Sequence, residues 1–150
     1  MKSLSKILLL LALCVLVMAL AACSYMPQAE LVEGAESEQV IQMAEPIAVN
    51  LLQGLNDQDY LTFSRDFDDT MKKALDQKSF TEMAATFAEK IGNYQSLEVE
   101  KVERIENLYV VTYKARYEKE EAVSIRLTIR EGEPTQVAGL WFDSPKLRTN

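Results

Sequence analysis

The hydrophobic period of the chain changes near Tyr94, and this change constrains the fold more than any other feature. Before it, apolar residues recur at steps of three and four, which is typical of helices packed on a core. After it, apolar and polar residues alternate, which predicts strands with one buried face. The chain is therefore expected to be α+β, with N-terminal helices packed on a curved antiparallel sheet of about four strands.

Local signals set the expected helix boundaries. Ser37 is a good N-cap for the first helix, and Pro46 inside that helix predicts a kink or a restart. Ser79 and Glu82 have the spacing of a capping box at the start of the last helix. The expected helices cover residues 37–55, 57–64, 70–75 and 79–91.

The second half of the chain is expected to form a meander. Polar turns at 106–107, 118–121 and 131–134 separate the alternating segments. The expected strands cover residues 97–105, 109–117, 123–129 and 137–142, and a polar tail follows at 144–150.

The N-terminus has the pattern of a secretory signal. Lys2 and Lys6 precede the uncharged, apolar segment 7–22, which is shorter than the roughly 20 residues that span a bilayer. The segment ends in Leu-Ala-Ala-Cys and resembles the lipobox of bacterial-type lipoproteins, in which the cysteine becomes acylated, for example with palmitate. This resemblance implies lipid attachment at Cys23. A retained membrane anchor and an ordinary thiol beside an ordinary cleavage site are the alternatives.

A lipobox divides the chain into four parts. Residues 1–22 are expected to be a signal peptide, 23–38 an acidic tether, 39–143 a single domain and 144–150 the tail. The protein would then be a lipid-anchored membrane protein facing outside the cytoplasm, at the cell surface or in the periplasm.

Composition excludes several classes of function. The net charge is −7, and it becomes −9 without Lys2 and Lys6 (14 basic and 23 acidic residues), which argues against nucleic-acid binding. The chain has no histidine, Cys14 would leave with the signal, and Cys23 would be blocked by lipid. Nucleophilic triads and zinc sites built on histidine and cysteine are therefore excluded. No metal or other cofactor is expected, and a non-catalytic domain is favoured over an enzyme.

Several phrases, taken in order, resemble one family of lipoprotein-borne bacterial and archaeal domains. They include Asp59-Tyr60, Phe63-Ser64, Asp66-Phe67-Asp68, Val110-Val111-Thr112-Tyr113 and Gly139-Leu140-Trp141-Phe142. This family is domain of unknown function 3887, within the nuclear transport factor 2-like, cone-shaped α+β superfamily. The resemblance covers about residues 40–142. It implies the cone-like (also cystatin-like) fold and no activity, since the family has none to transfer.

Three groups of residues are candidates for a site. Aromatic side chains could line a pocket for a small apolar ligand inside the cone, or they could simply fill the core. Five aspartates between positions 57 and 69 could form a calcium site or a carboxylate dyad, or they could cap helices. Four cations on the polar face of neighbouring strands could dock an acidic partner or a polymer, or they could pair with glutamates across strands. The pocket candidates are Tyr60, Phe63, Phe67, Tyr113 and Trp141, and the cations are Lys114, Arg116, Arg126 and Arg130.

These observations favour a membrane-anchored, non-catalytic module that binds a small apolar ligand or a protein partner. One alternative is a small-molecule hydrolase or isomerase that uses carboxylate and tyrosine residues, which requires an acid buried among Tyr60, Tyr113 and Trp141. The other is a self-associating module, such as a homodimer formed through the open sheet face, which requires an exposed apolar patch on that face.

Overall fold

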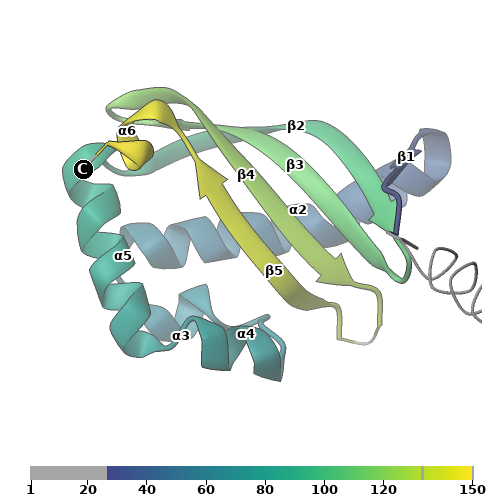
Figure 1. Cartoon of the computed structure of the whole chain (residues 1–150), viewed down its shortest axis with the longest axis horizontal. Helices are drawn as coiled ribbons and strands as arrows, with labels where there is room; N and C mark the ends of the chain where they lie inside the picture. The colour runs from purple at the N-terminus through teal and green to yellow at the C-terminus, as the bar shows by residue number, and fades with distance from the viewer. Residues whose placement is uncertain (1–26, 133, 150) are drawn as a thin grey trace, which may run out of the picture.

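The computed structural model describes residues 27–149 except residue 133. The predicted signal peptide and Cys23 lie outside the described residues. The described chain forms helices followed by an antiparallel meander, which confirms the expected α+β class (Figure 1). The elements are β1 (Glu30–Val32), α2 (Gly34–Asn56), α3 (Tyr60–Phe63), α4 (Asp69–Ala74), α5 (Gln77–Lys90), β2 (Tyr94–Ile105), β3 (Leu108–Tyr117), β4 (Glu120–Arg130), β5 (Gln136–Asp143) and α6 (Pro145–Arg148).

Helix α2 begins earlier than its sequence signals indicate. Glu33 occupies the N-cap position instead of Ser37, and the helix continues through Pro46 without the expected restart. Pro46 lies on the exposed side of α2, where its ring does not disturb the core. The opposite side supplies a continuous apolar stripe of buried residues, as the period of three and four predicts. This stripe is Val40, Ala44, Ile47, Ala48, Leu51, Leu52 and Leu55.

Aspartates set the start of the three helices that follow. Asp59, Asp68 and Asp76 each accept a hydrogen bond from a backbone N–H in the first turn of α3, α4 and α5. The predicted capping box at Ser79 is wrong, because Asp76 caps α5 three residues earlier by accepting from Ser79 N at 2.9 Å. Asp is at least as good an N-cap as Ser, so the first strong cap in the sequence determines the start.

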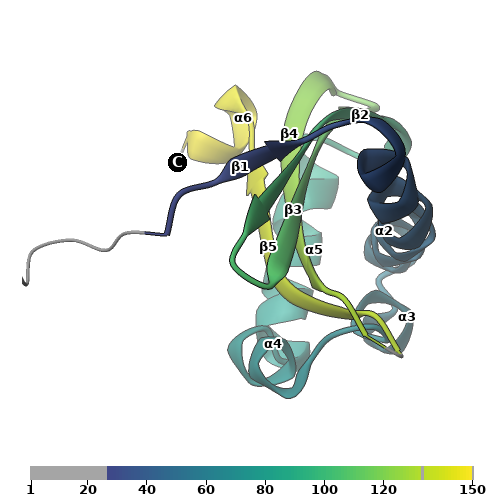
Figure 2. The same ribbon diagram turned by 90° about the vertical axis from the view of Figure 1, so that its right-hand side faces the viewer.

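The five strands form one antiparallel sheet in sequence order. Four of them were expected, and the fifth is β1, which pairs with β2 through Val32 and Val102. The segment 23–38, expected to be an acidic tether, therefore contains β1 and the first turn of α2 in its described part. Figure 2 shows α2 along one side of the sheet and the short α6 on the other side, at one end of the strands.

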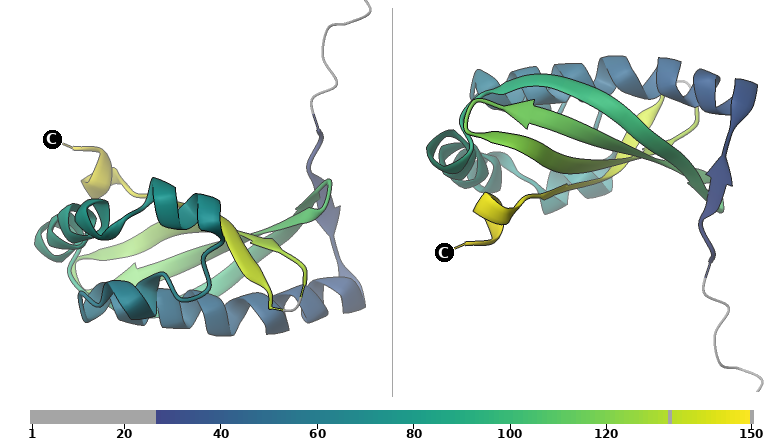
Figure 3. Two further views of the ribbon diagram at one scale, coloured as in Figure 1. Left: turned by 90° about the horizontal axis from the view of Figure 1, so that it is seen from below. Right: turned by 90° about the horizontal axis from the view of Figure 1, so that it is seen from above.

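The core lies between the helices and the inner face of the sheet. Its largest fully buried side chains include Phe63, Phe80, Tyr113 and Tyr117. In both panels of Figure 3, α5 lies at one end of the sheet and β1 at the other, so the chain enters the domain at the end away from α5. Within the described residues, no helix has the length and apolar character needed to cross a membrane.

The C-terminal segment is more ordered than a polar tail. Ser144 is buried and caps α6 by accepting from Leu147 N at 3.2 Å. Lys90 on α5 donates to the carbonyl oxygen of Thr149, which ties α6 to α5. A four-residue helix has no detectable hydrophobic period, so the sequence pattern could not reveal it.

Candidate functional site on the outer face of the sheet

The five predicted pocket residues do not converge on one space. Phe63, Phe67 and Tyr113 are buried in the core, and Tyr60 is half-buried with its hydroxyl donating to Leu75 O at 3.1 Å. Trp141 lies on the other side of the sheet, where 51% of its surface is exposed. Four of the five are thus brought together inside the cone, and Trp141 is separated from them.

Aromatic packing fills the described interior. The Phe63 ring centroid lies 5.2 Å from that of Phe67 and 4.7 Å from that of Phe80, within the range of favourable ring contacts. Beside Tyr113, the space between α2 and the sheet has no volume that holds a water molecule. A second gap, beside Tyr117, is about 10 Å³, which is close to the minimum for one water. Neither gap has room for an organic ligand in this conformation.

The buried tyrosines are poor candidates for acid–base chemistry. Burial raises the pKa of the Tyr113 phenol well above its usual range, and the negative charge of Glu45 acts in the same direction. Burial also raises the pKa of Tyr117. Both phenols therefore stay protonated at physiological pH, and neither hydroxyl has a hydrogen-bond partner among the described residues.

The aspartate cluster has a structural explanation. Asp59 and Asp68 are helix N-caps, as one of the two sequence interpretations expected. A hydrogen bond from the Thr62 side chain holds the pKa of Asp59 below its usual value. Every described aspartate and glutamate is at least partly exposed to solvent. Within the same part of the chain, no three acidic side chains are grouped closely enough to hold a metal ion.

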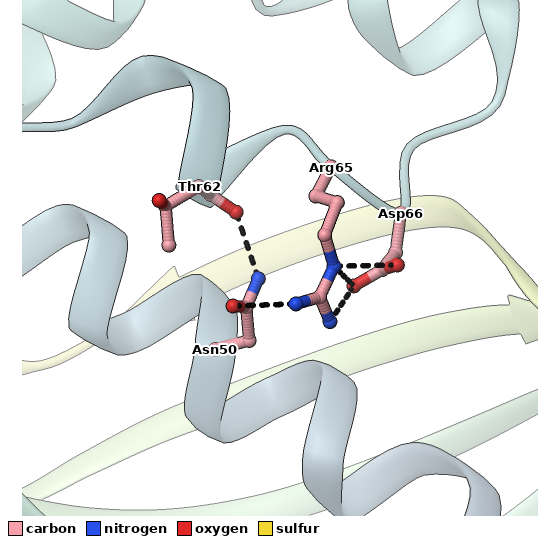
Figure 4. A network of polar contacts seen from close by, with 4 residues as sticks. All are labelled: Asn50, Thr62, Arg65 and Asp66. Atoms are coloured by element: carbon pink, nitrogen blue, oxygen red, sulfur yellow. Dashed lines mark hydrogen bonds and ion pairs between the residues drawn. The ribbon is translucent and has the colours of Figure 1, made fainter.

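A polar network joins α2 to the α3–α4 connection. The Asn50 side chain donates to Thr62 O at 2.8 Å and accepts from Arg65 at 2.9 Å, and Arg65 also pairs with Asp66 at 2.9 Å (Figure 4). The four residues thus form hydrogen bonds and an ion pair with one another, and they connect α2 with α3 and the segment after it. The network holds α3 against α2, and its polar groups bond to one another, so it is interpreted as structural.

The outer face of the sheet has a different character. Outward positions of β3 carry Lys114 and Arg116, and outward positions of β4 carry Arg126 and Arg130, all exposed. Trp141 on β5 lies directly opposite Arg126 in the strand register. We call these five residues the outer-face cluster. The predicted sharing of one face by the four cations is confirmed.

The cations of the outer-face cluster have no anionic partner within the described residues. The ion pairs there join other residues, such as Lys101 to Glu103 and Arg104 to Glu30 and Glu36. Glu98 lies opposite Lys114 in the register, yet the Lys114 ammonium and the Glu98 carboxylate do not form an ion pair. Among the described residues these cations therefore do not pair with glutamates across strands. In that part of the chain, four unpaired cations lie on this face, while two of its acids, Glu103 and Asp143, are held in ion pairs with Lys101 and Arg148.

Sequence periodicity contained a signal for the position of Trp141 that the pocket hypothesis ignored. Leu140 and Phe142 pack against the core, and strict alternation places the residue between them on the opposite face. The register that puts Trp141 beside Arg126 depends on an irregularity between Thr128 and Ile129. That irregularity has no clear sequence signature, so the pairing itself could not be predicted.

The described residues therefore form a cone-like α+β domain in which the gaps beside Tyr113 and Tyr117 are too small for an organic ligand, and the outer face of its sheet carries four unpaired cations. The chain belongs to the family described as "Protein of unknown function (DUF3887)", whose model matches residues 48–140. This confirms the family resemblance seen in the sequence. No curated protein matches the chain. Because the family description gives no activity, function is argued from the site.

Proposed function

We propose that this protein is a membrane-anchored, extracytoplasmic lipoprotein and that its domain is a non-catalytic module that binds a partner through the outer-face cluster. The Leu-Ala-Ala-Cys sequence ending at Cys23 supports the anchor. The observation that carries the binding role is the half-exposed Trp141 opposite Arg126, on a sheet face with three further cations that form no ion pair among the described residues. Exposed tryptophan and arginine are the residue types that most often dominate binding energy in protein interfaces.

The interior gives less support to the other functions. A ligand-filled cone needs space beside Tyr113, and the aliphatic side chains of α2 and the sheet leave none there in this conformation. A carboxylate–tyrosine enzyme needs a buried acid, and all described carboxylates reach solvent. A cavity would support a ligand site, and a buried acid would support an enzyme. The described interior offers neither beside Tyr113.

Self-association through the outer face is also disfavoured. Trp141 is the exposed large apolar residue of the outer-face cluster, its four companions are cations left unpaired within the described chain, and the acids Glu103 and Asp143 on the same face are already engaged in ion pairs. Two copies joined by this face would bring like charges together, which is unfavourable in a partly desolvated interface. The face is therefore better suited to a partner of opposite charge.

Site-specific crosslinking in living cells tests the proposed binding face. A photoreactive residue replaces Lys114 on the outer face in one full-length variant and replaces Lys78 on α5 in a matched control. Both are exposed lysines, so each variant loses the same charge. We expect a discrete crosslinked product from position 114 and none of that mass from position 78. Equal product from both positions, or none from either, would contradict a binding role for this face.

A further inference from the structure

The cations of the outer-face cluster form a row that runs along the strands. Arg116 and Lys114 are two residues apart on β3, which corresponds to about 6.6 Å. Lys114 is opposite Ser124, so Arg126 is its diagonal neighbour at about 7–8 Å. Arg130 continues the row on β4, about 13 Å beyond Arg126. Three successive charges are thus spaced by about 7 Å, and the whole row extends over roughly 27 Å.

The spacing of about 7 Å matches the distance between side chains on one face of an extended peptide. In an extended peptide, side chains on one face recur every second residue, at about 6.6–6.8 Å. A segment with an acidic residue at alternate positions would place one carboxylate beside each of Arg116, Lys114 and Arg126. Arginine forms paired hydrogen bonds with a carboxylate, which adds geometric selectivity to the charge attraction.

Trp141 distinguishes a peptide from other polyanions. Its ring lies beside Arg126, near the middle of the row, and has no described aromatic neighbour. On one side of it lie the small residues Thr128 and Gly139, and on the other lies Asp143, which is paired with Arg148; the indole remains half-exposed. A peptide can present an apolar side chain at the facing position after its third acid, where the row has a gap between Arg126 and Arg130 beside Trp141, whereas an inorganic polyphosphate has only charged oxygens to offer.

We propose that the outer-face cluster binds an extended acidic segment of a protein, with carboxylates on Arg116, Lys114 and Arg126 and an apolar side chain on Trp141. This inference rests on the proposed function, because it names the partner class of the same face. Exposed ion pairs are individually weak and are screened over about 10 Å at 0.1 M salt. The binding should therefore depend on several contacts at once and should weaken as salt is added.

The test uses the full-length lipoprotein in uncharged detergent micelles. The probe, called the Glu-Ser peptide, is a fluorescein-labelled 12-residue peptide with Ser at alternate positions and Glu at the others, except for one Leu that follows the third Glu. A Lys-Ser peptide with the same Leu is the charge control. Binding is followed by fluorescence anisotropy at about 50 mM salt. We expect the Glu-Ser peptide to bind and the Lys-Ser peptide not to bind.

Charge-matched variants locate the binding. Arg126→Glu should weaken binding of the Glu-Ser peptide about tenfold or more, because it removes an attraction and adds a repulsion. Trp141→Ala should weaken it about fivefold. Lys78→Glu changes the charge by the same amount as a lysine reversal on the face but lies on α5, so it should have little effect. Because Arg126 is exposed, Arg126→Glu should keep the wild-type melting temperature. If Arg126→Glu lowers the melting temperature, peptide binding is measured with Arg126→Gln instead.

The outcomes separate this inference from the proposed function. If linear polyphosphate of equal charge binds more tightly than the Glu-Ser peptide and is equally sensitive to Arg126→Glu, the face is a binding face but the acidic-peptide inference is wrong. If neither polyanion binds while position 114 still crosslinks in cells, the inference is again wrong and the proposed function stands. If neither binds and position 114 does not crosslink, both fail.

Discussion

Replacing Gly54 with alanine is expected to destabilise the domain by about 2–3 kcal/mol, although alanine normally favours a helix. Gly54 lies in α2 against the backbone of α3. A Cβ added there would lie 2.4 Å from Phe63 N, 2.8 Å from Phe63 Cα and 3.0 Å from Thr62 C. These are backbone atoms, so no side-chain rotation can relieve the contact. Helix α3 would have to move away from α2.

That movement would disturb the core and the network in Figure 4 together. Phe63 contacts Phe67 and Phe80, and Thr62 O accepts from Asn50 at 2.8 Å. Urea unfolding followed by circular dichroism measures the change in free energy of unfolding. Gly132→Ala is the matched control, because its added Cβ would be 3.6 Å from the nearest atom, Pro134 O, and it should change stability by less than about 0.5 kcal/mol. A Gly54→Ala protein as stable as the wild type would show that α3 does not approach α2 this closely.

Replacing Cys23 with serine is expected to abolish membrane anchoring. Acyl chains attached to a cysteine can hold a protein on a bilayer when two or more are present, and serine cannot carry the lipid of a lipobox cysteine. Cells grown with a palmitate analogue should label the wild type and the Cys14→Ser control but not Cys23→Ser. Cys14 lies inside the apolar segment 7–22, so its loss leaves the lipobox intact. Palmitate labelling of Cys23→Ser at the wild-type level would overturn the anchor.

Most of the fold could be predicted from the sequence because its long helices and strands show a clear hydrophobic period. Val111, Tyr113 and Ala115 alternate with polar residues, and the structure places them inside as β3. The stripe on α2 was equally clear. Short elements were missed for a physical reason: β1 has three residues and α6 has four, so neither completes enough of a period to be detected.

Helix starts were harder to predict, because several residues competed for each cap. Ser37 and Ser79 are good N-caps in isolation. The structure starts α2 at Gly34 and α5 at Gln77, since the chain is already positioned for a helix by β1 and by Asp76. The preceding strand therefore accounts for the early start of α2, and an earlier local cap accounts for the early start of α5.

The candidate site was only half predictable. Alternation placed Lys114, Arg116, Arg126 and Arg130 on one face, and the structure agrees. Whether such cations pair with glutamates depends on side-chain conformations, which no sequence period encodes. Trp141 was assigned to the interior because it is large and apolar, yet its strand parity puts it beside Arg126. For Trp141, the alternation of side chains along β5 therefore predicts the exposed face correctly, whereas its apolar character does not.

Trp141 is the single tryptophan of the chain, so its fluorescence reports directly on the outer face. The most direct test of the central claim is to compare quenching of the full-length protein by iodide and by caesium ions at low ionic strength. A local positive region attracts iodide and repels caesium, although the net charge of the protein is −7. We therefore expect iodide to quench more strongly than caesium, relative to a free tryptophan amide, and Arg126→Gln to reduce the difference. Caesium quenching equal to or stronger than iodide quenching would show that the face is not electropositive, and the proposed binding face would be wrong.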